Sequence, residues 1–108
     1  MSDFIKVCSI DDLVQNSGVA ALVDSVQIAL FYVAGEVFAL DNFDPVGKAF
    51  VMSRGMVGDL KGQLMVAAPL YKQHYSLKTG KNIDDEDAPS ISSYQVKVEG
   101  SQVFVKLK

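Results

Sequence analysis

Cys8 and His74 are the only cysteine and the only histidine in the 108-residue chain. These two residue types supply the thiolates and imidazoles that hold zinc ions and iron–sulfur clusters in proteins. One of each cannot form an intramolecular disulfide, a four-ligand zinc site or a four-ligand iron–sulfur cluster. We therefore interpret Cys8 as a small apolar residue of a strand, not a reactive thiol. We interpret His74 as a polar residue on a half-exposed strand, not a ligand or proton shuttle.

The motifs of several enzyme classes are missing from the sequence. It contains no Gly-x-Ser-x-Gly turn, no Walker loop and no Gly-x-Gly-x-x-Gly segment. The acidic run at residues 84–87 lacks the alternating oxygen ligands and the glycine of a calcium-binding loop, so we interpret it as a solvated connector. We therefore expect no enzymatic activity from the chain alone.

The charges are distributed unevenly along a chain whose net charge is −3. Residues 45–81 contain six bases and one acid, a net charge of +5, whereas the remaining residues contain four bases and twelve acids, a net charge of −8. Such a basic middle segment is either a solvated lysine-rich face or a surface suited to an acidic partner, a phosphate or a cofactor.

Length and composition indicate one compact globular domain that spans residues 1–108. Hydrophobic residues make up 49% of the chain and charged residues 21%, which excludes disorder. The apolar stretch at residues 28–34 is far shorter than the roughly 20 residues that span a bilayer. The N-terminal residues have no basic stretch followed by an apolar run, as a secretory leader has, so we expect a cytoplasmic protein with no membrane partner.

The hydrophobic pattern predicts mainly strands. Alternation at residues 4–8 indicates a strand, and the serine and aspartates that follow it indicate a short helix. The stretch 26–40 predicts a hairpin that turns at residues 34–36, and the stretch 94–107 predicts a second hairpin. Between them, residues 42–81 are rich in glycine, with short strands expected at 55–58 and 63–67. The predicted fold class is all-β: a small β-sandwich or barrel with a loop-rich insertion and one short helix.

The order of the hairpin and the glycine- and proline-containing segments that follow it resembles the Rieske [2Fe–2S] domain. In that family, two loops of the form Cys-Pro-His and Cys-Pro-x-His hold the cluster. The corresponding loops here are Asn42–Gly47 and Ala68–Tyr71, 21 residues apart between Val46 and Ala68. The resemblance places Asp44 and Ala68 at the cysteine positions, and Val46 and Tyr71 at the histidine positions. It therefore implies a Rieske-like β-sandwich or barrel without the cluster ligands.

Over essentially the whole chain, and most specifically in the segment Pro69–Leu77, the sequence also resembles the small subunits of bacterial NAD(P)H-dependent nitrite reductases. This resemblance implies a cytoplasmic complex that reduces nitrite to ammonium, in nitrate assimilation or a dissimilatory role. The large subunit would bind FAD, sirohaem, an iron–sulfur cluster and NADH or NADPH. The small subunit would bind no cofactor, would have no catalytic or metal-ligating residues, and would be required for activity through protein contact.

Bases and apolar side chains on or near the two loops are the candidate interface with that large subunit. An alternative is that the aromatic residues Phe43, Phe50 and Tyr71 fill the space that the cluster occupies in relatives. We also expect an ion pair between Asp44 and Arg54 to fasten the first loop. The candidate interface residues are Lys48, Phe50, Met52, Arg54, Tyr71 and Lys72. We expect the acidic run to lie at the opposite end from the loops, so that charge reversal at Asp84 is the control substitution.

Two other classes of function compete with a non-catalytic subunit. One is a free electron carrier of the Rieske-ferredoxin type, which the cysteine and histidine counts oppose. The other is an unrelated small β-barrel binding module that holds nucleic acid on the basic middle segment. A sequence pI near 4.9 and the lack of basic clusters interleaved with aromatic residues oppose it, so we expect no nucleic-acid partner.

Overall fold

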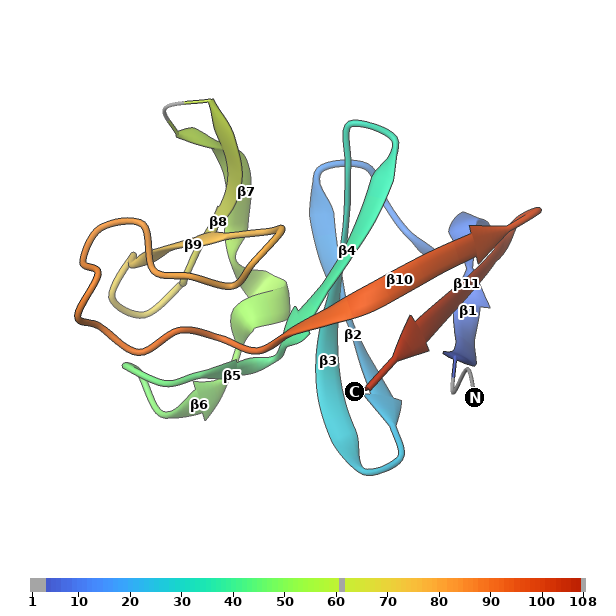
Figure 1. Cartoon of the computed structure of the whole chain (residues 1–108), viewed down its shortest axis with the longest axis horizontal. Helices are drawn as coiled ribbons and strands as arrows, with labels where there is room; N and C mark the ends of the chain where they lie inside the picture. Colours follow the sequence, from blue (N-terminus) through green and yellow to red (C-terminus); the bar gives the residue numbers. More distant parts are fainter. Residues whose placement is uncertain (1–3, 61, 108) are drawn as a thin grey trace.

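The structure, a computed structural model, describes residues 4–60 and 62–107 and has the predicted all-β fold. Its body is a six-stranded sheet in which every neighbouring pair of strands is antiparallel, and it occupies the right half of Figure 1. The sheet is curled so that its two edge strands contact each other. In spatial order the strands are β1 (Phe4–Ser9), β11 (Gln102–Lys106), β10 (Ser93–Glu99), β4 (Glu36–Asp41), β3 (Val26–Val33) and β2 (Ser17–Val23).

Both predicted hairpins are confirmed. Strands β3 and β4 are joined by Ala34 and Gly35, whose φ angles of 53° and 77° are those of a two-residue hairpin turn. Strands β10 and β11 are joined by a turn that contains Gly100, whose φ is 60°, and the pair of residues next to this turn is Glu99 with Gln102. The strand predicted at residues 4–8 is β1, which pairs with β11 at the edge of the sheet.

The short helix predicted after β1 is a single 3-10 turn, η1 (Ile10–Asp12). Ser9 caps it: its hydroxyl accepts from the backbone of Asp11, and the Asp12 carboxylate accepts from the backbone of Ser9. A second 3-10 turn, η2 (Met52–Arg54), lies in the insertion, so the described part of the chain has two short helical turns where the sequence predicted one.

Strand β2 was not predicted from the sequence. It contains glycine and two alanines, which weakens the apolar alternation, but all seven of its residues pair with β3. Its Gly18 is required by packing, because a β-carbon there would collide with the carbonyl oxygen of Ser53 in η2 and with the ring of Phe31. The small residues of β2 therefore allow η2 to approach the sheet closely.

The loop-rich insertion between β4 and β10 is also confirmed, and it forms the left half of Figure 1. A two-stranded ribbon and a three-stranded antiparallel sheet give it its frame. Its strands are β5 (Phe43–Asp44), β6 (Ala49–Phe50), β7 (Met56–Leu60), β8 (Gln63–Ala67) and β9 (His74–Ser76).

Two buried clusters, one on each face of β3 and β4, form the core. Ile28 and Leu30 of β3 belong to the cluster inside the curled sheet, whereas Phe31 and Val33 belong to the cluster between the sheet and the insertion. Successive side chains of a strand point to opposite faces, which explains why both central strands are almost continuously apolar. The insertion is thereby fixed to the body by apolar packing.

No helix within residues 4–60 and 62–107 is long and apolar enough to cross a membrane.

Candidate partner-docking site at the loop end

The first loop, residues 44–48, is closed by its first and last residues. The backbone N–H of Lys48 donates to the carbonyl oxygen of Asp44 over 2.7 Å. The Asp44 carboxylate is fully buried, and its Oδ1 accepts from the backbone N–H groups of Val46 and Gly47 at 2.9 and 3.0 Å. Asp44 therefore holds the loop in shape through the backbone, and its side chain is not available to a partner.

The predicted ion pair between Asp44 and Arg54 is wrong. Asp44 Oδ2 is buried and has no hydrogen-bond partner, whereas Arg54 is exposed on η2. Over the described residues the ion pairs are those of His74 with Asp84 and of Lys97 with Glu99. Oδ1 of the Asp44 carboxylate accepts from two backbone N–H groups, and these bonds hold the loop without a base from η2.

The second loop, residues 68–72, is built in the same way. The backbone N–H of Lys72 donates to the carbonyl oxygen of the buried Ala68 over 3.0 Å. The N–H of Ala68 in turn donates to the carbonyl oxygen of Gln73 over 2.9 Å. Lys48 and Lys72 end their loops in the left-handed region, at φ 59° and 56°. The two loops are therefore equivalent turns, each ending in an exposed lysine.

The two loops contact each other at Gly47. A β-carbon on Gly47 would lie 2.6 Å from Cδ1 of Leu70 and 2.8 Å from Oδ2 of Asp44. A side chain at position 47 would therefore require Leu70 or Asp44 to shift. The loops therefore form one surface, which we call the loop end and define as residues 44–48 and 68–72 with the neighbouring Phe50.

Apolar side chains are exposed at the loop end. Phe50, Leu70 and Tyr71 have exposed fractions of 53%, 50% and 65%. The rings of Phe43 and Phe50 pack at a centroid distance of 5.1 Å and an interplanar angle of 60°. Side chains exposed to this degree do not fill an internal space, so Phe50 and Tyr71 do not fill a vacated cluster site. Leu70 belongs to this surface and was missed from the sequence.

Met52 does not contribute to this surface, contrary to the sequence-based prediction. Its side chain is fully buried in the core cluster between the sheet and the insertion. The 3-10 turn η2 packs against β2 and β3, and the backbone N–H groups of Met52 and Ser53 donate to the carbonyl and side-chain oxygens of Asn42. The sequence pattern around Met52 is too short to show which face of this turn is buried.

Behind the second loop, β9 carries a tyrosine that the sequence analysis did not single out. Tyr75 is fully buried, and burial, followed by the nearby Asp44 carboxylate, raises the pKa of its phenol. The alternation of polar and apolar residues in His74–Ser76 is the only sequence signal for its burial. Tyr75 thus packs in the core below the loops and is not part of the exposed surface.

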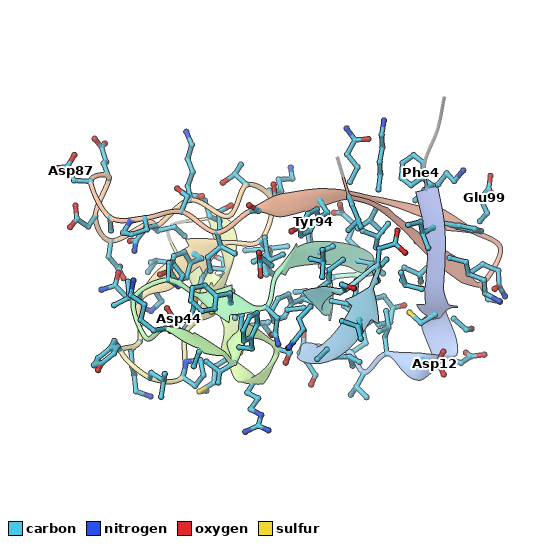
Figure 2. The ribbon with its side chains drawn as sticks, turned by 90° about the horizontal axis from the view of Figure 1, so that it is seen from below. Phe4, Asp12, Asp44, Asp87, Tyr94 and Glu99 are labelled. Carbon is cyan, nitrogen blue, oxygen red and sulfur yellow. The ribbon has the colours of Figure 1, made fainter. Side chains whose placement is uncertain are left out.

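His74 is a partly exposed strand residue, as predicted. Its Nδ1 lies 2.9 Å from Oδ2 of Asp84, which also accepts from the backbone N–H of His74. The acidic run is exposed, as predicted, but it is ordered: Oδ1 of Asn82 accepts from the backbones of Asp84 and Asp85. Figure 2 shows Asp87 at the same end of the molecule as Asp44, so the acidic run and the first loop share one end of the molecule.

The side chains at the loops do not fit a Rieske cluster. Such a cluster needs two thiolates and two imidazoles. Asp44, Val46, Ala68 and Tyr71 offer only a carboxylate already bound by two N–H groups, two aliphatic side chains and an exposed phenol. Cys8 lies on β1 in the six-stranded body, with its thiol pKa raised by burial and by Asp12. No group of three or more His, Cys, Asp or Glu residues in the described part of the chain is arranged to hold a metal ion.

The fold and the loop pair define a Rieske-like domain, and the comparisons show the same class. The profile of the Rieske-like [2Fe–2S] domain matches residues 3–106, so the chain belongs to that family. The chain is similar to the nitrite reductase (NADH) small subunit of Escherichia coli (strain K12), with 38% identity over 98% of this chain and 99% of that protein.

Two further relatives extend the comparison. A crystal structure of an NADH-dependent nitrite reductase small subunit from Mycobacterium tuberculosis superposes with a TM-score of 0.91 at 37% identity, covering 97% of this chain and 95% of that one. The nitrite reductase [NAD(P)H] large subunit of Klebsiella oxytoca is 39% identical over 92% of this chain. The match covers only 10% of that large subunit, so this chain spans about a tenth of its length.

Proposed function

We propose that the chain is the small subunit of a cytoplasmic NAD(P)H-dependent nitrite reductase, and that it supports the reduction of nitrite to ammonium by contact with a large subunit. The observation that carries this proposal is end-to-end similarity to small subunits, 38% identity over 99% of the Escherichia coli protein. The similarity extends over nearly the whole of both sequences, so it is not confined to one shared motif.

The Klebsiella oxytoca protein supports the choice of partner. A segment of that large subunit is 39% identical to 92% of this chain. In that protein, a domain like this one is covalently joined to the rest of a nitrite reductase large subunit. We infer that in the present case the same two parts meet as separate chains, with the large subunit as the partner.

The chemistry of this chain supports a non-catalytic role. The loop end supplies exposed apolar side chains and two lysines, but no thiolate, imidazole or accessible carboxylate for redox or acid–base chemistry. FAD, sirohaem, an iron–sulfur cluster and the nicotinamide nucleotide would all bind to the large subunit. A ferredoxin-type electron carrier would need a cluster that the loop side chains do not fit.

We further propose that the large subunit docks on the loop end. Phe50 and Tyr71 would supply the buried anchors, and Lys48 and Lys72 the surrounding charge. Arg54 is exposed but lies on η2 against the sheet, so we assign it a peripheral position. Met52 is excluded because it is buried within this chain.

Reconstitution tests the proposed function. The large subunit from the same cell, prepared without this chain, should show little NADH- or NADPH-dependent formation of ammonium from nitrite. Addition of this chain should restore turnover, whereas the chain alone should show none. Equal turnover of the large subunit with and without the chain would refute the proposal. The Tyr71→Ala variant should require a higher concentration for the same turnover, because an interface anchor has been removed.

A further inference from the structure

The lysines that end the two loops share a backbone conformation that is unusual for their residue type. Lys48 and Lys72 have φ angles of 59° and 56°, in the left-handed region that favours glycine. Each donates its N–H to the carbonyl oxygen of the residue four positions earlier, so each loop depends on this conformation for closure. Glycine would adopt it at no steric cost, so the backbone conformation does not require a lysine at either position.

The two ammonium groups form no ion pair within the described part of the chain. Both lysines are exposed. The contact of Leu70 with Gly47 joins the loops, so Lys48 and Lys72 belong to the same surface as the exposed Phe50 and Tyr71. Four other non-glycine residues of the described chain also have a positive φ, but Lys48 and Lys72 are the two that carry a positive charge.

We propose that Lys48 and Lys72 are a matched pair of charged anchors that orient the large subunit on the loop end, where they meet acidic groups placed around an apolar patch. The inference rests on the proposed function, because it takes the large subunit as the partner. It adds the residues that fix the orientation and the chemistry of the partner's surface. The loops then act as two equivalent turns that each hold the backbone of one exposed lysine in a fixed position.

The placement of the chain ends supports this occupant. Figure 1 shows the start of β1 and the end of β11 in the six-stranded body, away from the insertion. In the Klebsiella oxytoca relative, the covalent connection must leave the matching segment from one or both of its ends. If that segment has the same fold, the connection starts in the body and leaves the loop end free to contact the rest of the large subunit.

The acidic run, residues 84–87, limits how a partner can arrange its charges against this end of the molecule. Asp87 lies at the same end as the loops, so the surface of this end carries both signs of charge (Figure 2). A partner must therefore present acidic groups to the lysines and not to the acidic run. Such an alternation selects one orientation and mainly affects the rate of association.

Glycine substitution separates the binding role of the lysines from their effect on folding. Lys48→Gly and Lys72→Gly remove the charge and relieve the left-handed strain together, so the melting temperature of the chain should stay the same or rise. Binding to the large subunit at low salt should weaken in each variant, and in the double variant association should slow about tenfold and lose most of its salt dependence. Lys48→Arg and Lys72→Arg retain the charge and should retain binding.

Ala34→Gly is the matched control. Ala34 is exposed and has a φ of 53°, but it is uncharged and lies in the β3–β4 turn of the body. Its substitution should raise or preserve the melting temperature and leave binding unchanged. If the unsubstituted chain binds and the double glycine variant binds equally well, the lysine anchors are refuted while the proposed function stands. If the unsubstituted chain does not bind the large subunit, both proposals fail.

Discussion

The side chain of Leu70, in the second loop, lies so close to Gly47, in the first loop, that no free space remains for a side chain at position 47. Gly47→Ala would place a methyl group 2.6 Å from Leu70 Cδ1, and we expect it to destabilise the chain by about 1–3 kcal/mol through overpacking. Urea denaturation measures this loss. In the double variant Gly47→Ala, Leu70→Ala, part of the stability should return. Additive losses would mean that the two residues do not compete for space.

The buried Asp44 carboxylate should contribute to stability mainly through its two backbone donors. Asp44→Ala leaves the N–H groups of Val46 and Gly47 without this acceptor, and we expect a loss of about 2–3 kcal/mol in the free energy of unfolding. Asp44→Asn keeps an acceptor oxygen and should cost about 1 kcal/mol. Arg54→Ala should change stability by less than about 0.5 kcal/mol. If Arg54→Ala lowered the free energy of unfolding as much as Asp44→Ala, the result would indicate an ion pair between the two residues and would contradict the structure.

Two tyrosines should ionise late when the folded chain is titrated with base. Burial raises the pKa of both Tyr75 and Tyr94, with further increases from Asp44 and Asp41 respectively. The folded chain therefore holds these protons to higher pH than the unfolded chain. Their contribution to stability is complete below the ordinary tyrosine pKa of about 10 and declines as the pH rises above it.

Absorbance of tyrosinate is a clean probe of this titration, because the chain has four tyrosines and no tryptophan. Tyr75→Phe and Tyr94→Phe should each remove one late-ionising group from the titration curve. The decline of stability above about pH 10 should also be shallower in each variant. If neither substitution changed the high-pH part of the titration curve, the raised pKa values of Tyr75 and Tyr94 would be contradicted.

Met52 and Phe50 should respond to truncation in opposite ways, although they are two residues apart. Met52→Ala opens a cavity in the core cluster and should cost about 2–5 kcal/mol of stability. Phe50→Ala removes an exposed ring that contacts Phe43 and should cost only about 1 kcal/mol. Affinity for the large subunit should fall in Phe50→Ala, and measurement of both quantities distinguishes the core residue from the surface residue.

Strong, regular patterns allowed much of the fold to be predicted. The turn at Ala34 and Gly35 lies between two apolar strands, and the alternation of β10 and β11 is regular, so both hairpins could be located. Strand β2 could not, because its small residues are fixed by a contact that is distant in sequence: Gly18 meets η2, more than 30 residues later. Sequence periodicity contains no information about such a contact.

The two loops were predictable in position, whereas the burial of their side chains was predictable only in part. The family resemblance placed Lys48, Phe50, Tyr71 and Lys72 on or near the loops, and in the structure all four are exposed. The burial of Met52 and Asp44 depends on how η2 and β5 pack against distant strands, which the local pattern does not reveal. The sequence interpretation also placed the acidic run at the opposite end from the loops, and Figure 2 shows that Asp87 lies at the same end as Asp44. For this reason Glu99, at the opposite end, replaces Asp84 as the position for a control charge reversal.

The central claim is that this chain supports nitrite reduction by contact and not by carrying electrons on a cluster of its own. The most direct measurement is turnover of the large subunit with a preparation of this chain that has been treated with a chelator and shown by elemental analysis to contain no iron. The account predicts that this iron-free chain restores NADH- or NADPH-dependent ammonium formation fully, with saturation at a fixed ratio of the two chains. Restoration that required iron to be returned to the chain would contradict it.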